Sequence, residues 1–232
     1  EKIEGHTYED YNEYKGNHTT AIETQMDTVI GTTNANDPVI LTLEIVEISF
    51  MFIFKLERKT FDETLKKLKA FEDNITTELF NKILEILLTD NGSEFKDIKT
   101  LIEVFPNINI YYCHPYSSFE KGSIENNHEL LRRVIPKGIS LKPYTQEDYN
   151  LLASHINSLY REKLNGKCPF DLVNEYIPLE KIHKLGLSKI NDMDVNLTPY
   201  LLGIKNVENI KKYLDYPDMK KANISLNPDQ KP

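Results

Sequence analysis

Several features that define other classes of protein are missing from this chain of 232 residues. Its two cysteines, Cys113 and Cys168, are too few for a disulfide framework and form no CxxC metal motif, so we expect reduced thiols. No apolar run approaches the roughly 18–20 residues of a membrane span, and the charged start, EKIEGHTYEDY, is not a signal peptide. We therefore expect a cytoplasmic protein with no membrane partner.

Positive charge is also scarce, because 28 Lys and Arg residues face 36 Asp and Glu residues, giving a net charge of −8 and a pI of about 5.3. Proteins that coat DNA neutralise its phosphates with clustered Lys and Arg, so this balance argues against that class. It still permits an enzyme that acts on nucleic acid through acidic metal ligands. The initiator Met is missing as well, so we expect a fragment of a longer chain.

The first half of the chain has the patterns of three strands and a helix. A strand is predicted over Ile22–Gly31, and two antiparallel strands over Val39–Val46 and Ser49–Leu56, which together make a meander. Thr60 then suits the N-cap of an amphipathic helix that breaks near Asn74. The hydrophobic content of 40% predicts a packed core.

Helices and strands alternate in the second half. LEILLTD is a buried strand that ends on Asp90, a short helix runs to about Val104, and INIYYCHP is another strand. Helices follow over about Ile124–Val134, after the N-cap Thr145, and at Pro169. This order predicts an α/β fold, a mixed five-stranded sheet flanked by helices, and it matches the ribonuclease H-like arrangement.

Three carboxylates occupy places where such a sheet can gather them. Asp27 lies in the first strand, Asp90 ends the fourth, and Glu125 opens the helix after the fifth. Converging carboxylates repel one another unless cations bind between them, and oxygen ligands suit Mg²⁺ or Mn²⁺. Two such ions about 3.5–4 Å apart can support phosphodiester cleavage.

Each carboxylate also has an ordinary structural interpretation. Asp27 fits a sheet edge, Asp90 fits a turn before Asn91 and Gly92, and Glu125 fits the first turn of a helix, where the dipole favours it. Residue types alone leave both interpretations open.

Four segments resemble one known family: QMDTVIG, LLTDNGSEF, HPYSSFEKGSIENNHELLRRVIPKG and YTQEDYNLLASHINSLYREKLNGKCPFDLV. The chain resembles transposases of the IS30 insertion-sequence family, within the retroviral integrase-like DDE superfamily, over roughly residues 5–201. The resemblance implies a ribonuclease H-like catalytic core that cleaves and transfers DNA strands, with Mg²⁺ as cofactor and Mn²⁺ able to substitute. It implies that Asp27, Asp90 and Glu125 are the catalytic metal ligands, and 34 residues separate the last two.

The resemblance also implies partners and domains. Transposases act on element ends and target DNA as assemblies, so we expect a homodimer or larger assembly on DNA. Family members place a helix-turn-helix domain before the core, so residues 1–22 would be a linker from a missing DNA-binding region. Residues 23–176 would form the core, and residues 177–232 a helical extension and a tail with partial order at best after Leu201.

Candidate DNA contacts surround the predicted triad. Asn91 lies in a turn that lets the DNA backbone approach, and Arg132 is two helical turns beyond Glu125 on the same face. The remaining candidates could instead be solvated side chains that do not contact DNA, and we expect His128 in particular to face solvent. These candidates are Lys121, Asn126, His128, Arg133 and Lys137.

The chain departs from the family where basic or aromatic residues are usual. Val46 and Glu47 stand where an Arg-Lys pair is common, and Phe119 stands where a Trp is common. Basic residues often flank the catalytic Glu of the family, whereas this chain has Ser123 and Asn126 there. Lost phosphate contacts weaken DNA affinity by orders of magnitude at moderate salt. Two alternatives therefore stand beside an active transposase core: a nuclease of the same fold without strand transfer, and an inactive remnant that acts as an interaction domain.

Overall fold

The computed structural model describes residues 5–95 and 97–203, so most of the predicted tail after Leu201 lies outside the described residues. Five strands form one sheet in the order β3-β2-β1-β4-β5. β2 pairs antiparallel with β1 and β3, whereas β4 pairs parallel with β1 and β5. The predicted mixed five-stranded sheet is confirmed. The strands are β1 (Glu23–Ile30), β2 (Val39–Ile45), β3 (Phe50–Leu56), β4 (Ile86–Thr89) and β5 (Asn109–Tyr112).

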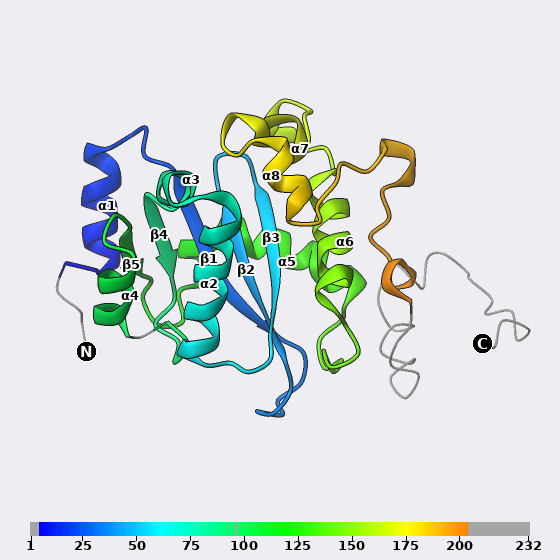
Figure 1. Cartoon of the computed structure of the whole chain (residues 1–232), viewed down its shortest axis with the longest axis horizontal. Coiled ribbons are helices and arrows are strands. Elements are labelled where there is room, and N and C mark those ends of the chain that lie inside the picture. Colours follow the sequence, from blue (N-terminus) through cyan, green and yellow to red (C-terminus); the bar gives the residue numbers. More distant parts are fainter. Residues whose placement is uncertain (1–4, 96, 204–232) are drawn as a thin grey trace, which may run out of the picture.

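Helices cover both faces and both ends of the sheet (Figure 1). α2 packs on one face, α5 on the other, α1 beside β5 and α6 beside β3. Within the described ranges, no helix is both long and apolar enough to cross a bilayer. The helices are α1 (Tyr8–Asn17), α2 (Phe61–Ile75), α3 (Thr77–Ile83), α4 (Ile98–Val104), α5 (Gly122–Val134), α6 (Gln146–Asn157), α7 (Pro169–Leu172) and α8 (Leu179–Lys184).

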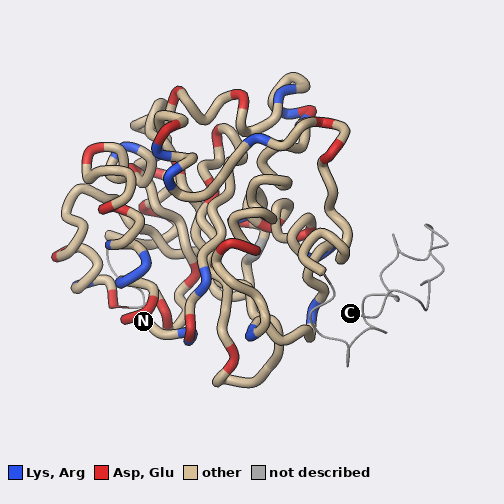
Figure 2. The backbone as a smooth tube through the Cα atoms, turned by 45° about the vertical axis from the view of Figure 1, so that its right-hand side comes forward, with Lys and Arg blue, Asp and Glu red and all other residues tan. Residues whose placement is uncertain are grey.

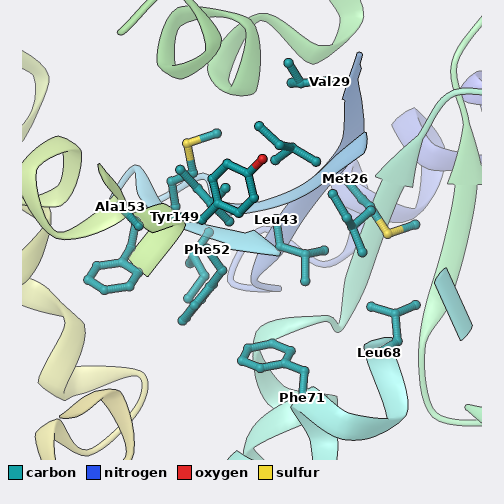
Figure 3. Close-up of a cluster of buried hydrophobic side chains, with 14 of the residues drawn as sticks. Met26, Val29, Leu43, Phe52, Leu68, Phe71, Tyr149 and Ala153 are labelled. Atoms are coloured by element: carbon teal, nitrogen blue, oxygen red, sulfur yellow. The ribbon is translucent and has the colours of Figure 1, made fainter. Parts of the chain in front are cut away.

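The hydrophobic core fills the sheet face under α2 and continues onto α5 and α6 (Figure 3). Met26, Leu43 and Phe52 are neighbours across β1, β2 and β3, and all are buried together with Leu68 and Phe71 of α2. Strand side chains alternate between faces, so the residues just before and just after each of these three along its strand point to the opposite side of the sheet.

The opposite sheet face is polar near its centre. Gln25 of β1 lies across from Glu44 of β2, and Asp27 lies across from Thr42. α5 covers this face, and Glu44 and Thr42 are fully buried. Because buried polar groups require hydrogen-bond partners, this face must be tied to α5 by specific polar contacts.

Two amide side chains of α6 close the outer edge of β3. Asn157 donates from Nδ2 to the Met51 carbonyl and accepts the Met51 N–H at Oδ1, both at 2.8 Å. Gln146 repeats the arrangement, accepting from the Lys55 N–H at 2.9 Å and donating to the Ile53 carbonyl at 2.8 Å. Backbone groups that an edge strand would otherwise expose are thus satisfied by side chains.

α1 covers the other end of the sheet. Tyr11 of α1 is buried beside Tyr111 of β5, and the Asn109 amide donates to the Tyr14 hydroxyl at 3.0 Å. The Tyr112 N–H also donates to the His6 carbonyl at 2.9 Å. The segment predicted to be a linker therefore lies against the sheet from His6 onward.

Asn157 should be worth more to stability than an exposed residue of the same helix. Asn157→Leu leaves the buried Met51 N–H and carbonyl without partners, so we expect the free energy of unfolding to fall by about 2–4 kcal/mol. Urea denaturation measures this change. Leu151→Ala, on the exposed side of α6, is the control and should shift it by less than about 0.5 kcal/mol. Equal midpoints for Asn157→Leu and the wild type would show that the amide is dispensable.

Candidate active site

The parallel pairing of β1 with β4 places two of the three predicted carboxylates side by side. Gln25 lies opposite Leu88 in this register, so continuing it by two residues sets Asp27 opposite Asp90. Asp90 follows directly after the last residue of β4, where the chain leaves the sheet. Two acidic side chains therefore meet at one point on the sheet edge.

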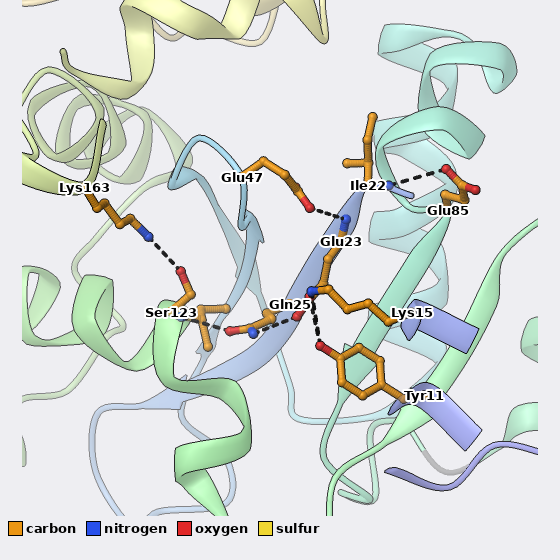
Figure 4. Close-up of polar contacts among 10 residues, drawn as sticks. Tyr11, Lys15, Ile22, Glu23, Gln25, Glu47, Glu85, Ser123 and Lys163 are labelled. Carbon is orange, nitrogen blue, oxygen red and sulfur yellow. Dashed lines mark hydrogen bonds and ion pairs between the residues drawn. The ribbon is translucent and has the colours of Figure 1, made fainter. Parts of the chain in front are cut away.

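A chain of buried hydrogen bonds fixes the start of α5, which carries Glu125 (Figure 4). The Ile124 N–H donates to Gln25 Oε1 at 3.0 Å, and Gln25 Nε2 donates to Glu23 Oε1 at 2.9 Å. Glu23 also accepts from the Tyr11 hydroxyl at 2.9 Å and pairs with Lys15. The first turn of α5 is thus tied to β1 only two residues before Asp27.

The carboxylates disfavour one another's charge. Burial raises the pKa of Asp90, and the nearby Asp27 raises it further. Burial likewise raises the pKa of Glu125, again with a contribution from Asp27. Asp27 therefore interacts with both of the other carboxylates, as expected for a group that requires a cation.

Lys121 supplies positive charge to this group. Its Nζ lies 3.2 Å from Asp27 Oδ2, and its side chain is only 4% exposed. Its charge also acts to lower the pKa of both Asp90 and Glu125. Lys121 is predicted from the sequence as a phosphate contact, but in this structure its amino group is buried against Asp27.

The carboxylates have the donor chemistry that Mg²⁺ prefers, since all three offer oxygen ligands. Across residues 5–95 and 97–203, however, no group of three or more His, Cys, Asp or Glu side chains stands close enough, as arranged, to hold a metal ion. The cationic group beside Asp27 is instead the Lys121 ammonium. The carboxylate oxygens are therefore chemically suited to a divalent ion, and the Lys121 ammonium is the positive charge that lies beside Asp27 in this arrangement.

His128 is held inside the site rather than in solvent. Its side chain is 12% exposed, and Nε2 lies 2.8 Å from the Thr42 hydroxyl. That hydroxyl donates to the Asp27 carbonyl at 3.1 Å, so Nε2 must be the donor to Thr42. Burial lowers the pKa of His128 to about 3, which keeps the ring neutral. The expectation of a solvent-facing histidine is therefore wrong.

A cavity of about 1210 Å³ opens beside Asp27 and Glu125. Arg132 lines it and donates from Nη2 to the Ile30 carbonyl at 2.8 Å. The sequence-predicted contacts Asn91 and Asn126 are exposed but do not line this cavity. The cavity thus gathers two of the predicted triad residues and these predicted DNA contacts: His128, Arg132, Arg133 and Lys137.

Glu94 belongs to the same site, although it is not among the residues predicted from the sequence. Its fully buried carboxylate accepts from the Thr28 hydroxyl at 2.6 Å and pairs with Lys59 at 3.0 Å. Burial opposes ionisation, but the hydrogen bond from Thr28 lowers the pKa of Glu94. Its place in TDNGSEF, four residues after Asp90, was the available signal.

The glycine of the same motif has a steric role. A Cβ at Gly92 would lie 2.7 Å from Glu94 Oε2 and 3.1 Å from Asp90 Oδ1. Both carboxylates therefore fold back over this residue, and Glu94 joins the turn after Asp90 to Thr28, the neighbour of Asp27.

The fold defined above is shared with a retroviral integration complex. A chain of the simian T-cell lymphotropic virus intasome, solved with the PP2A regulatory subunit B56 gamma, matches with a TM-score of 0.51 and 16% identity. The match covers 66% of this chain and 54% of that chain. It confirms the ribonuclease H-like, integrase-core type of fold.

Curated relatives give a more specific likeness. A probable transposase for the insertion-like sequence element IS1161 of Streptococcus salivarius is 32% identical over 133 residues, which is 54% of this chain and 34% of that protein. The transposase InsI for insertion sequence element IS30C of Escherichia coli is 28% identical over 153 residues, which is 66% of this chain and 38% of that protein. No family model matches the chain.

The homologues of this chain are therefore IS30-family transposases, which confirms the resemblance inferred from its motifs. The matched part spans only between 34% and 38% of the length of the two relatives described above.

Asp90→Asn should stabilise the metal-free protein. The fold raises the pKa of the Asp90 carboxyl above its ordinary value of 3.8. The protonated carboxyl therefore stabilises the folded protein below pH 3.8, and this stabilisation is lost as the pH rises through the raised pKa. At pH 7 the ionised group is therefore unfavourable, and solvent screening limits the gain from neutral Asn to about 0.5 kcal/mol.

Urea unfolding at several pH values measures this gain, which should shrink as the pH falls towards 4. Asp73→Asn, on the exposed side of α2, is the control and should show no such trend. A less stable Asp90→Asn variant at pH 7 would contradict the electrostatic picture.

Proposed function

We propose that this chain is the catalytic core of a DDE transposase that cleaves DNA at the ends of an insertion sequence and joins the freed ends to target DNA. The observation that carries the proposal is the β1–β4 register, which sets Asp27 opposite Asp90 and beside the anchored start of α5. Homology to IS30-family transposases supports the same reaction class.

Asp27, Asp90 and Glu125 would hold Mg²⁺, for which Mn²⁺ can substitute. The bound ions would supply activation of a water or 3′-hydroxyl and charge stabilisation at the leaving oxygen. The protein positions the three ligands: Gln25 holds the backbone before Glu125, and Glu94 holds the turn after Asp90 against β1. Rigid placement of this kind is what metal-assisted transfer requires of the protein.

The cavity beside the triad is the proposed path of the DNA backbone. Arg133 and Lys137 are exposed at its wall, and Arg132 and His128 lie deeper in it. Cationic side chains there can neutralise phosphates that pass Asp27 and Glu125. Asn91 and Asn126 are exposed next to the triad and would contact DNA outside the cavity.

The cavity lining is mixed in charge, because Arg132, Arg133 and Lys137 stand beside Asp27, Glu125 and Glu129. Acidic segments accompany basic ones over the face shown in Figure 2, in keeping with the net charge of −8. We therefore propose that strong DNA affinity comes from other domains or from a second copy, with residues 1–22, whose helix α1 packs against β5, connecting a DNA-binding region to the core. Residues 23–176 would be the core and 177–232 an extension, working in the bacterial cytoplasm where the element resides.

Glu125→Gln should abolish DNA cleavage. The experiment follows Mn²⁺-dependent cutting of a labelled duplex that carries an end of the parent element. Loss of one ligand oxygen should slow cutting by about 100-fold or more. Glu129→Gln is the matched control, since Glu129 lines the same cavity one helical turn later and is exposed. It should cut within a few-fold of the wild type.

Unchanged cutting by Glu125→Gln would refute the assigned triad. Cutting by the wild type without joined donor–target products would instead leave a nuclease of the same fold. If the wild type does not cut even with its DNA-binding region present, the chain is an inactive remnant.

Arg133→Gln should weaken DNA binding uniformly across sequences. Removing one phosphate contact should reduce the slope of log K against log salt by about 0.9. Fluorescence anisotropy on duplexes at salt concentrations between roughly 50 and 200 mM gives the slope. Lys184→Gln, exposed on α8, removes the same charge away from the cavity and should leave the slope unchanged. Equal slopes for both variants would remove Arg133 from the DNA path.

A further inference from the structure

The position of Lys121 needs an explanation beyond DNA binding. A lysine side chain is strongly hydrated and is rarely buried without a partner that compensates for lost water. Here the partner is Asp27, 3.2 Å away, on a side chain that is itself mostly buried. Lys121 thus occupies the interior of the site and not its rim.

The geometry of the chain delivers this ammonium to the site. Lys121 ends the 3-10 turn η1 (Ser118–Lys121) and stands four residues before Glu125, on the same side of the helix start. The Glu120 carboxylate accepts from the His114 N–H and contacts its ring, both at 2.8 Å. The backbone of η1 is therefore anchored, whereas the long Lys121 side chain can move about its own bonds.

We propose that the Lys121 ammonium is the resident cation of the metal-free site and that a divalent ion binds at Asp27 only by displacing it. This inference rests on the proposed function in one respect, the assignment of Asp27, Asp90 and Glu125 as metal ligands.

Charge balance supports the displacement. Three ionised carboxylates carry three negative charges, and the Lys121 ammonium offsets one of them where it touches Asp27 and also acts on the other two. A divalent ion bound at the same Asp27 oxygen would lie within a few ångströms of Lys121 Nζ, where two cations repel strongly. Metal binding therefore has to break the Lys121–Asp27 pair.

The displaced side chain would then gain a second use. The Lys121 ammonium would move away from the carboxylates, while its backbone stays fixed at the start of α5, close to Glu125. There it would be within reach of a phosphate oxygen of bound DNA. The phosphate contact expected of Lys121 from the sequence would thus arise only in the metal-loaded protein.

Lys121→Met tests the proposal through metal affinity and not through catalysis. Methionine keeps much of the side-chain volume and removes the competing charge, so the Kd for Mn²⁺ measured by calorimetry should fall by at least about tenfold, or about 1.4 kcal/mol. Lys121→Arg keeps the charge and should stay close to the wild-type Kd.

Lys163→Met is the matched control for net charge. Lys163 is exposed and donates to the Ser123 hydroxyl near the start of α5, at 3.2 Å, so its loss changes the local charge equally without freeing Asp27. Its Kd for Mn²⁺ should change by less than about threefold, since exposed charges are screened. A tenfold gain in this variant too would reduce the effect to bulk charge and overturn the proposal.

Unfolding provides a second measurement in case Lys121→Met is unstable without metal. The proposal expects this variant to have a lower Tm than the wild type in chelator and a larger rise in Tm with Mn²⁺. Equal Mn²⁺ affinities, or no Mn²⁺ binding by either protein, overturn it. Tighter binding by Lys121→Met together with unimpaired cleavage by Glu125→Gln would uphold the displacement and refute the proposed function.

Discussion

The parallel register between β1 and β4 is the constraint on which the site depends. Gln25 opposite Leu88 sets Asp27 opposite Asp90, and a slip of one residue would turn either side chain to the other face of the sheet. The backbone hydrogen bonds of a central strand hold this register more firmly than any side-chain contact could. The repulsion between the two carboxylates is therefore imposed by the sheet and has to be balanced by what packs around it.

The two faces of the sheet divide the work between stability and chemistry. Met26, Leu43 and Phe52 face α2 in a dry core, while their neighbours Gln25, Asp27 and Glu44 face α5. The apolar face can hold the strands in place while the polar face keeps ionisable groups out of full contact with water. Cations at the site would act on a preformed arrangement, since strands and helix start are fixed without them.

Much of the fold followed from the sequence because its signals are local. The meander, the helix capped by Thr60 and the strand ending at Asp90 all depend on short patterns, and the predicted break near Asn74 falls at Thr76, where φ is 102°. The three carboxylates could be proposed as a triad because each belongs to a specific motif, and their role stays a prediction. The pairing of Lys121 with Asp27 and the burial of His128 could not be predicted, because both depend on how closely α5 packs against β1 and β2.

The closed edge of β3 has a consequence for assembly. Asn157 and Gln146 occupy the backbone groups of Met51, Ile53 and Lys55, so an incoming strand would find those groups already engaged. Neither strand exchange between copies nor growth of a continuous intermolecular sheet can proceed along these positions. Any chain that docks at this side of the sheet would have to contact α6 and not β3, which leaves the sheet and the register it fixes undisturbed.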